Sequence, residues 1–177
     1  MIYFISDTHF YHKTLAIKNR KFDSVEQMNQ HIIKNWNETV SDDDDIYILG
    51  DLFYRSSIEN ANSILKLLNG NKYLVVGNHD KHYLSNENFK TDIFKQISEI
   101  IEFKSHNYLW VLCHYPLLEW NQKHYNNSIH LYGHVHDFKP EYYNKILGSN
   151  AVNVSCELIK YTPISIEQVL HNLNINL

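Results

Sequence analysis

Carboxylate, amide and imidazole side chains recur in this sequence directly after short apolar runs. Five such groups follow one another along the chain: Ser6-Asp7-Thr8-His9, Gly50-Asp51, Gly77-Asn78-His79-Asp80, His114 and Gly133-His134-Val135-His136. Asp carboxylates, an Asn carbonyl and neutral imidazoles are ligand types that suit Mn, Fe, Zn, Co or Ni. No cysteine lies among them, which argues against a thiolate-rich structural zinc site or an iron–sulfur cluster.

These donors are too numerous for one tetrahedral ion and fit two divalent ions that share a bridging carboxylate. Two ions supply four positive charges, whereas Asp7, Asp51 and a bridging hydroxide remove three. The remaining positive charge attracts an anion and lowers the pKa of bound water towards ~7. Ions ~3.5–4 Å apart can hold two phosphoryl oxygens while the bridging hydroxide attacks phosphorus in line.

Short apolar runs must position these donors, and we predict that they are buried strands. The runs are Ile2–Ile5, Ile46–Leu49, Tyr73–Val76, Tyr108–Cys113, Ile129–Tyr132 and Ala151–Val154. In open α/β sheets, ligands bind beyond the carboxyl ends of the strands. We therefore expect the donors, although distant in sequence, to converge in one cleft.

Three amphipathic helices are predicted from their capping residues. The first begins at Ser24 with Gln27 three residues later, the second begins at Ser56 with Glu59 and stops at Gly70, and the third begins at Ser165 with Gln168. Strands alternate with helices in the first half, which predicts βαβ units and a largely parallel sheet. The second half is denser in strands and favours a mixed sheet or a second layer.

Composition limits the function classes. The 177 residues carry a net charge of −4, and 44% are hydrophobic, so we expect one domain over residues 1–177 with a real core. The mild acidity argues against bulk electrostatic binding of nucleic acid. The apolar runs are too short to span a membrane, and Asp7 comes too early for a signal peptide. Cys113 and Cys156 are interpreted as buried hydrophobic residues, and a cytoplasmic protein is expected.

The ordered motifs resemble those of the calcineurin-like metallophosphoesterase superfamily, in particular its compact bacterial and phage members. They are Asp7-x-His9, Gly50-Asp51, Gly77-Asn78-His79-Asp80, His114 and Gly133-His134-x-His136. The resemblance extends from about residue 2 to residue 155. It implies an α/β fold, specifically a four-layer α/β/β/α sandwich with two mixed β-sheets.

The same resemblance implies a role for each residue. The first metal ion is held by Asp7, His9 and His136, the second by Asn78, His114 and His134, and Asp51 bridges them. Mn²⁺ is the expected metal, with Fe, Zn, Ni or Co as alternatives. His79 does not bind metal but donates a proton to the leaving oxygen or stabilises its charge. Asp80 either orients His79 or caps the segment that follows.

One motif departs from a subgroup of the superfamily. Phosphoprotein phosphatases carry G-D-x-x-D-R-G, whereas this sequence has Tyr54 in place of the second Asp and Ser56 in place of the final Gly. The departure argues against a dedicated protein phosphatase. Arg55 keeps its place and is a candidate phosphate ligand, because guanidinium binds phosphate through two hydrogen bonds. Its alternative is an ordinary surface residue at a helix entry.

Further substrate contacts are weaker candidates. His12 is either a metal ligand or substrate contact or a solvated loop residue, and Trp120 either stacks on a base or sugar or packs under its loop. Lys123 is a candidate contact in that same loop, since loops beside a rigid scaffold often carry specificity. Arg20 and Lys21 are interpreted as surface residues, with phosphate steering as the alternative.

The sequence therefore predicts a metal-dependent phosphoric ester hydrolase that acts on a phosphomonoester or phosphodiester. A nuclease or a nucleotide or cyclic-nucleotide phosphodiesterase of the same fold is the main alternative within this class. A small phosphate-ester substrate is favoured over nucleic acid, because the chain has little room for a separate nucleic-acid-binding or cap domain. A non-catalytic protein-binding scaffold is disfavoured, since His79 and all seven ligands are present. No feature of the sequence indicates an oligomeric state.

Overall fold

The computed structural model describes residues 1–125 and 127–175. The strands are β1 (Ile2–Ile5), β2 (Asp45–Ile48), β3 (Asn71–Val75), β4 (Phe94–Ser98), β5 (Ile100–Ser105), β6 (Tyr108–Cys113), β7 (Ser128–Tyr132), β8 (Ala151–Asn153) and β9 (Ile164–Ser165). The α-helices are α1 (Val25–Thr39), α2 (Ile58–Leu67), α3 (Asp80–Leu84), α4 (Pro140–Leu147) and α5 (Ile166–Asn172). Short helical turns cover Leu15–Asn19, Thr91–Ile93 and Lys123–Tyr125.

The strands form two mixed sheets, as predicted. The first sheet has the order β4-β3-β2-β1-β9, in which β1 to β4 are parallel and β9 is antiparallel to β1. The second sheet has the order β5-β6-β7-β8, in which only β5 runs antiparallel to its neighbour. Parallel strands place their carboxyl ends at one edge of a sheet, so each sheet presents one edge of loops that can carry polar side chains.

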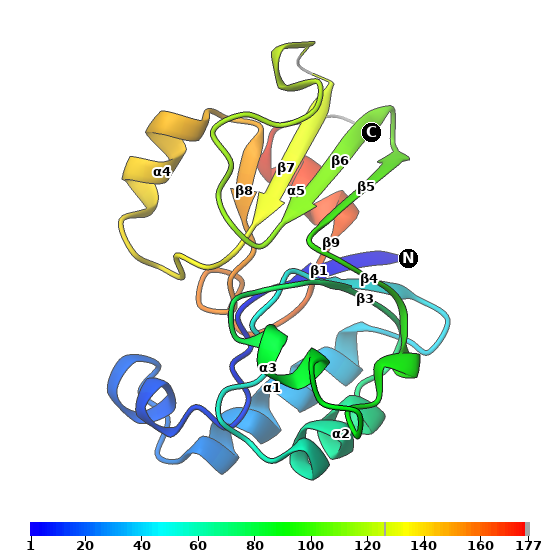
Figure 1. Cartoon of the computed structure of the whole chain (residues 1–177). Helices are drawn as coiled ribbons and strands as arrows, with labels where there is room; N and C mark the ends of the chain where they lie inside the picture. Colours follow the sequence, from blue (N-terminus) through cyan, green and yellow to red (C-terminus); the bar gives the residue numbers. More distant parts are fainter. Residues whose placement is uncertain (126, 176–177) are drawn as a thin grey trace.

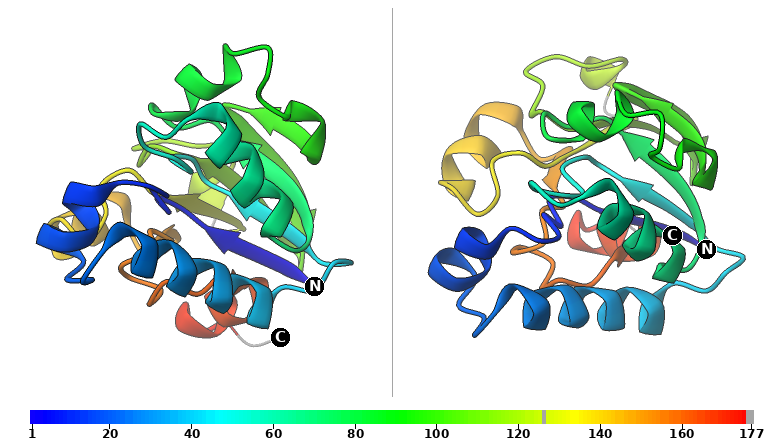
Figure 2. Two further views of the ribbon diagram at one scale, coloured as in Figure 1. Left: turned by 90° about the horizontal axis from the view of Figure 1, so that it is seen from below. Right: turned by 60° about the horizontal axis from the view of Figure 1, so that its bottom comes forward.

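The elements stack in layers around two main hydrophobic cores. Helices α1, α2 and α3 cover one face of the first sheet, and the second sheet lies on the opposite side (Figures 1 and 2). The core between the two sheets includes Phe4, Leu49, Trp110 and Leu131, with α5 closing one side through Val169. Helix α4 and the loop after β6 cover the outer face of the second sheet (Figure 1). This arrangement is the expected two-sheet α/β fold.

Backbone hydrogen bonds join the two sheets at the ends of β1 and β8. The Ser6 N–H donates to the Val154 carbonyl at 3.0 Å, and the Cys156 N–H donates to the Ser6 carbonyl at 3.0 Å. Ser6 and Ser155 form a parallel bridge between these segments. The loops after the strands of both sheets therefore meet at one place in the molecule.

The predicted helix starts are correct at two positions and wrong at one. Ser24 accepts a hydrogen bond from the Gln27 N–H at the start of α1, and Ser165 and Gln168 form a complete capping box at α5. Helix α2 is capped by Ser57, which accepts from the Asn60 N–H, rather than by the predicted Ser56. The reason lies in tertiary contacts, because the Ser56 N–H and hydroxyl are both bonded to the Tyr83 hydroxyl.

The six predicted strands are present, but β4, β5 and β9 were not predicted. Strands β4 and β5 lie at the sheet edges and expose part of their side chains. Their mixed apolar and polar composition lacks the continuous apolar run of a buried strand. Strand β9 has only two residues, which is too short for a pattern. Cys113 and Cys156 are both buried with free thiols, as predicted.

Among the described residues, none of the helices combines the length and the apolar character that a membrane span requires.

Packing between the sheets gives a first prediction. The Trp110 ring is fully buried and stacks on Phe4 with ring centroids 5.5 Å apart. Replacing Trp110 with alanine leaves a cavity in the core and is expected to lower the free energy of unfolding by ~3–5 kcal/mol. Urea unfolding at a fixed metal concentration measures this change. Tyr142, which is 56% exposed on α4, is the matched control, and Tyr142→Ala is expected to cost less than ~0.5 kcal/mol. Equal costs for the two variants would contradict the described core.

Candidate metal centre

The candidate ligands lie at the ends of five strands whose loops converge. Asp7 follows β1, Asp51 follows β2, Asn78 follows β3, His114 follows β6 and His134 follows β7. Several ligands adopt positive φ, a conformation that is uncommon for residues other than glycine. They are Asp7 at 56°, His9 at 47°, Asp51 at 55°, His134 at 67° and His136 at 50°. Such strain, gathered at one place, is typical of a functional site that the surrounding fold holds in position.

Three groups of side chains converge closely enough to hold metal ions. We call Asp7, His9 and His136 the Asp7 cluster, and Asp51, His114 and His134 the Asp51 cluster. A third group, made of His9, Asp51 and His79, lies between them. In each group the donor atoms lie within 4.8 Å of one another.

One carboxylate oxygen of Asp51 is shared by neighbours from both clusters. Its Oδ2 lies 3.6 Å from His9 Nε2, 3.6 Å from His114 Nε2 and 3.9 Å from His79 Nε2. Its Oδ1 accepts a hydrogen bond from the His79 N–H at 2.9 Å. Asp51 therefore occupies the central position of the site, with Oδ2 directed at imidazole nitrogens and Oδ1 tied to the backbone.

Buried polar atoms without partners indicate that the residues fit a cation. Among the described residues, Asp7 Oδ1 and both ring nitrogens of His9 are buried and make no hydrogen bond. Buried polar atoms are normally paired, and Asp7 Oδ1 and His9 Nε2, which lie 3.9 Å apart, are suited to a shared cation. Burial, reinforced by His136 and Arg20, lowers the pKa of His9 well below its usual value, so its imidazole is neutral and able to bind a metal.

The other oxygen of Asp7 is fixed by the protein. Asp7 Oδ2 accepts hydrogen bonds from the His134 N–H at 3.0 Å and from the Ser155 hydroxyl at 2.9 Å. These bonds leave Oδ1 directed at His136 Nε2, 3.7 Å away, and at His9 Nε2, 3.9 Å away. The carboxylate is thus divided into one oxygen held by the protein and one oxygen free for a ligand.

The remaining ligands form the open side of the site. Asn78 and His134 are exposed, whereas His114 is fully buried. Asn78 Oδ1 lies 3.2 Å from His114 Nε2, which brings the amide to the Asp51 cluster. His114 Nδ1 lies 2.7 Å from the Leu49 carbonyl, so Nδ1 carries the proton and Nε2 is free to bind. The Asp51 cluster is therefore open to solvent on the side of Asn78 and His134.

Asp80 holds the loops after β2 and β3 together. Its buried carboxylate accepts hydrogen bonds from the backbone N–H groups of Asp51 at 2.8 Å, Leu52 at 3.0 Å and Gly77 at 2.8 Å. Burial raises the pKa of Asp80 to about 6, and the three donors act against this increase. The contacts differ from both predicted alternatives for Asp80, since they fix the backbone that carries Asp51 and Asn78.

Two glycines let the backbone come close to the carboxylates. A Cβ atom on Gly133 would collide with Ser6 Oγ and Asp7 Oδ2, and one on Gly77 would lie 2.6 Å from the Asp51 nitrogen. Side chains at these two positions are therefore excluded by close approach to the ligand loops.

A buried arginine behind the Asp7 cluster corrects one prediction. Arg20, expected at the surface, is only 8% exposed and points inward. Its Nη1 donates to the Thr8 carbonyl at 2.8 Å, its Nη2 donates to the Asp7 carbonyl at 2.5 Å, and its Nε donates to Glu157 at 2.8 Å. Glu157 in turn accepts a hydrogen bond from His136 Nδ1 at 2.9 Å.

Sequence reasoning missed Glu157 and Ser155 altogether. Both lie after β8, in the segment Asn153-Val154-Ser155-Cys156-Glu157, where polar residues alternate with buried apolar ones. That alternation was the available signal, because it places every second side chain on the face that the metal ligands occupy.

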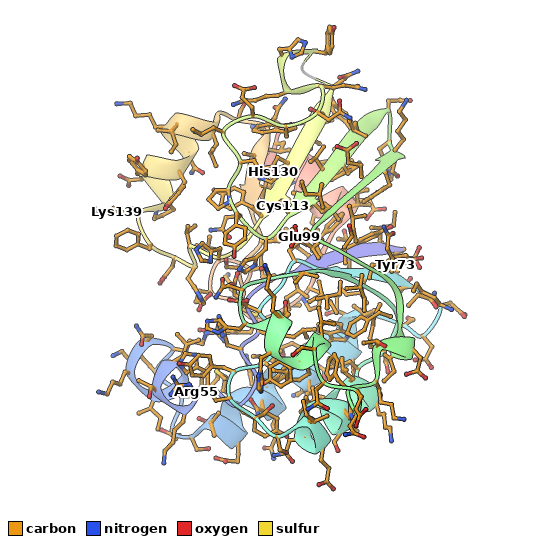
Figure 3. The ribbon with its side chains drawn as sticks, viewed as in Figure 1. Arg55, Tyr73, Glu99, Cys113, His130 and Lys139 are labelled. Carbon is orange, nitrogen blue, oxygen red and sulfur yellow. The ribbon has the colours of Figure 1, made fainter. Side chains whose placement is uncertain are left out.

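An aromatic group borders His79. The Tyr54 ring stacks on the His12 ring with centroids 3.7 Å apart and meets His79 edge-on at 4.9 Å. His12 is half-buried, and burial, together with Arg20 and other cations, lowers its pKa to about 4. Arg55 is exposed beside the segment that follows β1, with its guanidinium 5.2 Å from the centre of the Tyr54 ring (Figure 3).

The structure places Trp120 and Lys123 in the loop over the outer face of the second sheet. Trp120 is 8% exposed, donates to the Ser128 hydroxyl at 2.9 Å and packs near the His130 ring. The Lys123 ammonium lies 4.6 Å from the centre of the Trp120 ring and also bonds the Leu118 carbonyl. Trp120 therefore packs under its loop against β7, and Lys123 is directed at that loop.

Comparison with known proteins agrees with this geometry. A family model described as calcineurin-like phosphoesterase matches residues 1–138. An uncharacterized protein of Methanocaldococcus jannaschii is 38% identical over 96% of this chain and 89% of its own length. The Gene 66 protein of Mycobacterium phage L5 is 34% identical over 44% of this chain and 39% of its own length. The crystal structure of a protein of unknown function from Aquifex aeolicus has a TM-score of 0.75 at 27% identity and covers 97% of this chain and 98% of its own. The chain belongs to the calcineurin-like phosphoesterase family.

Proposed function

We propose that this protein is a phosphoesterase whose activity depends on two divalent metal ions. One ion is assigned to the Asp7 cluster and the other to the Asp51 cluster with Asn78. The observation that carries this proposal is the central position of Asp51, whose Oδ2 lies 3.6 Å from an imidazole nitrogen of each cluster. A carboxylate in that position is suited to bridge two cations.

The metal ions, His79 and Arg55 are each assigned a different role in ester hydrolysis. Bound divalent ions would neutralise the charge of a phosphate ester and lower the pKa of water to supply a nucleophile. His79 is assigned to assist departure of the leaving oxygen. Its ring borders the clusters and makes no hydrogen bond with the described residues, and its side chain is 39% exposed. Arg55, on the same side as Tyr54, is placed to bind a phosphate oxygen.

A small phosphate ester is the proposed substrate, and Mn²⁺ is the proposed metal. The open side of the site has Asn78 and His134 at the surface, so a compact substrate can enter without a separate substrate domain. The net charge of −4 gives no general attraction for nucleic acid. A nuclease or cyclic-nucleotide phosphodiesterase remains the alternative within the same chemistry, and a cytoplasmic location remains a prediction from the sequence.

A turnover panel tests the proposal. The chelator-treated protein is supplied with Mn, Fe, Ni, Co, Zn or Mg and assayed on p-nitrophenyl phosphate, bis-p-nitrophenyl phosphate, nucleotides, 2′,3′- and 3′,5′-cyclic nucleotides and single-stranded DNA and RNA. We expect metal-dependent hydrolysis of at least one small ester. Metal binding without hydrolysis of any substrate would instead favour a non-catalytic scaffold.

His79→Ala is expected to reduce kcat by ~10²–10⁴-fold without loss of bound metal, because proton donation is removed while the ligands stay. The loss should be larger for phenyl than for p-nitrophenyl esters, since p-nitrophenolate leaves without a proton. Elemental analysis and steady-state kinetics measure the two effects. His82→Ala, three residues further along α3, is the matched control and should retain activity. Wild-type turnover of both esters by the His79 variant would disprove the assigned role.

Asp51→Asn is expected to reduce bound metal from two equivalents to one or fewer, because the neutral amide is a weaker bridging ligand. Elemental analysis after gel filtration measures the stoichiometry. Asp42→Asn, in the exposed acidic loop before β2, removes the same charge away from the site and should leave metal content unchanged. Full occupancy in the Asp51 variant would rule out the bridging role.

A further inference from the structure

Glu157 receives three donors on a single carboxylate oxygen. Its Oε1 accepts from Arg20 Nε at 2.8 Å and from His136 Nδ1 at 2.9 Å, and lies 2.7 Å from Arg20 Nη2. The Arg20 side chain is fully buried and that of Glu157 is 11% exposed. The pair has no net charge, which limits the cost of burying it, and its hydrogen bonds satisfy most of the guanidinium.

The hydrogen bond to Glu157 sets the protonation of the His136 ring. A carboxylate can only accept, so Nδ1 of His136 carries a proton, and in the neutral ring that binds a metal Nε2 presents its lone pair. That lone pair lies 3.7 Å from Asp7 Oδ1, inside the Asp7 cluster. A carboxylate partner also makes an imidazole a stronger ligand than a carbonyl partner does.

Arg20 fixes the opposite side of the same cluster. Its two Nη atoms hold the carbonyls of Asp7 and Thr8, in the loop where Asp7 and His9 adopt positive φ. One guanidinium therefore ties the loop after β1 to the residue that orients His136.

The Asp51 cluster has weaker support. His114 is oriented by the Leu49 carbonyl rather than by a carboxylate, and both Asn78 and His134 are exposed. Asp51 supplies the one carboxylate of the Asp51 cluster. The Asp7 cluster has the carboxylate of Asp7 and also lies beside the bridging Asp51. Asp80 fixes the backbone on the Asp51 side, but no imidazole of that cluster donates a hydrogen bond to a carboxylate among the described residues. Charge, burial and the carboxylate partner of His136 thus favour the Asp7 cluster as a cation site.

We propose that Arg20 and Glu157 are positioning residues that make the Asp7 cluster the tighter of two metal sites, so that this cluster fills first. This inference rests on the proposed two-metal function and adds an order of loading to it.

Titration of the chelator-treated full-length protein with Mn²⁺ tests the inference. Isothermal calorimetry measures the affinities, and electron paramagnetic resonance follows the first and second equivalents. For the wild type we expect two classes of site, with the tighter class saturating at one equivalent. Binding of a single equivalent in total would overturn the two-metal function itself and with it the order of loading.

Glu157→Gln keeps an acceptor oxygen but removes the charge, and is expected to weaken the tighter class by ~10–100-fold while the weaker class is unchanged. Glu157→Ala should weaken the same class further, and Arg20→Lys should also affect that class. Glu38→Gln removes a carboxylate from the exposed face of α1, where Glu38 pairs with Lys34, and is the matched control.

Circular dichroism of each metal-free variant separates positioning from folding. The inference is supported if the variants have the same spectra as the wild type and lose Mn²⁺ affinity only at the tighter class of site. Unchanged affinities, an equal loss in both classes, or a loss that follows misfolding in both Glu157→Gln and Arg20→Lys would overturn it, and any of these results would leave the two-metal stoichiometry of the wild type standing.

Discussion

Two buried carboxylates, those of Asp7 and Asp51, bring negative charge to the junction between the two sheets. Their residues are 0% and 2% exposed, and isolated buried carboxylates are costly unless they are paired or bind a cation. Burial raises the pKa of Asp51, which expresses this cost directly. Each carboxylate has one oxygen held by N–H or O–H donors and the other facing imidazoles. The rest of the site follows from this need for a compensating cation.

The loops that carry the two carboxylates have a strained backbone, and contacts with other parts of the fold hold this backbone in place. Positive φ at five ligand residues and the close approach of Gly77 and Gly133 would not persist in an isolated loop. They persist because the loops are tied by Asp80, by Arg20 and by the bridge between Ser6 and Ser155. The two hydrophobic cores hold the strands from which these loops extend. The hydrophobic cores therefore stabilise the fold, whereas the hydrogen bonds of Asp80 and Arg20 hold the loops that carry the site.

The convergence of the strand-end donors could be predicted because each motif is local, with a buried run followed directly by a donor. The supporting residues could not be predicted in the same way. Arg20 and Glu157 are 137 positions apart, and the sequence around each residue does not indicate that the two form an ion pair. Asp80 was identified within its motif, yet two of its three hydrogen bonds run to the loop after another strand, β2. Contacts of this kind depend on the relative placement of elements, which periodicity and capping patterns do not encode. The same limit explains why α2 begins at Ser57, since Tyr83 binds Ser56 from a distant helix.

The departure from the phosphoprotein phosphatase motif has a structural consequence at the substrate side. Where those enzymes have a second aspartate, Tyr54 stacks on His12 and meets the edge of His79. A carboxylate there would add negative charge beside the metal ligands, whereas the observed ring pair is neutral and Arg55 adds a positive charge next to it. This wall therefore carries a positive charge and adds no third acid for a cation to offset. Tyr54 also contacts the His79 ring edge-on, and that ring makes no hydrogen bond with any of the described residues.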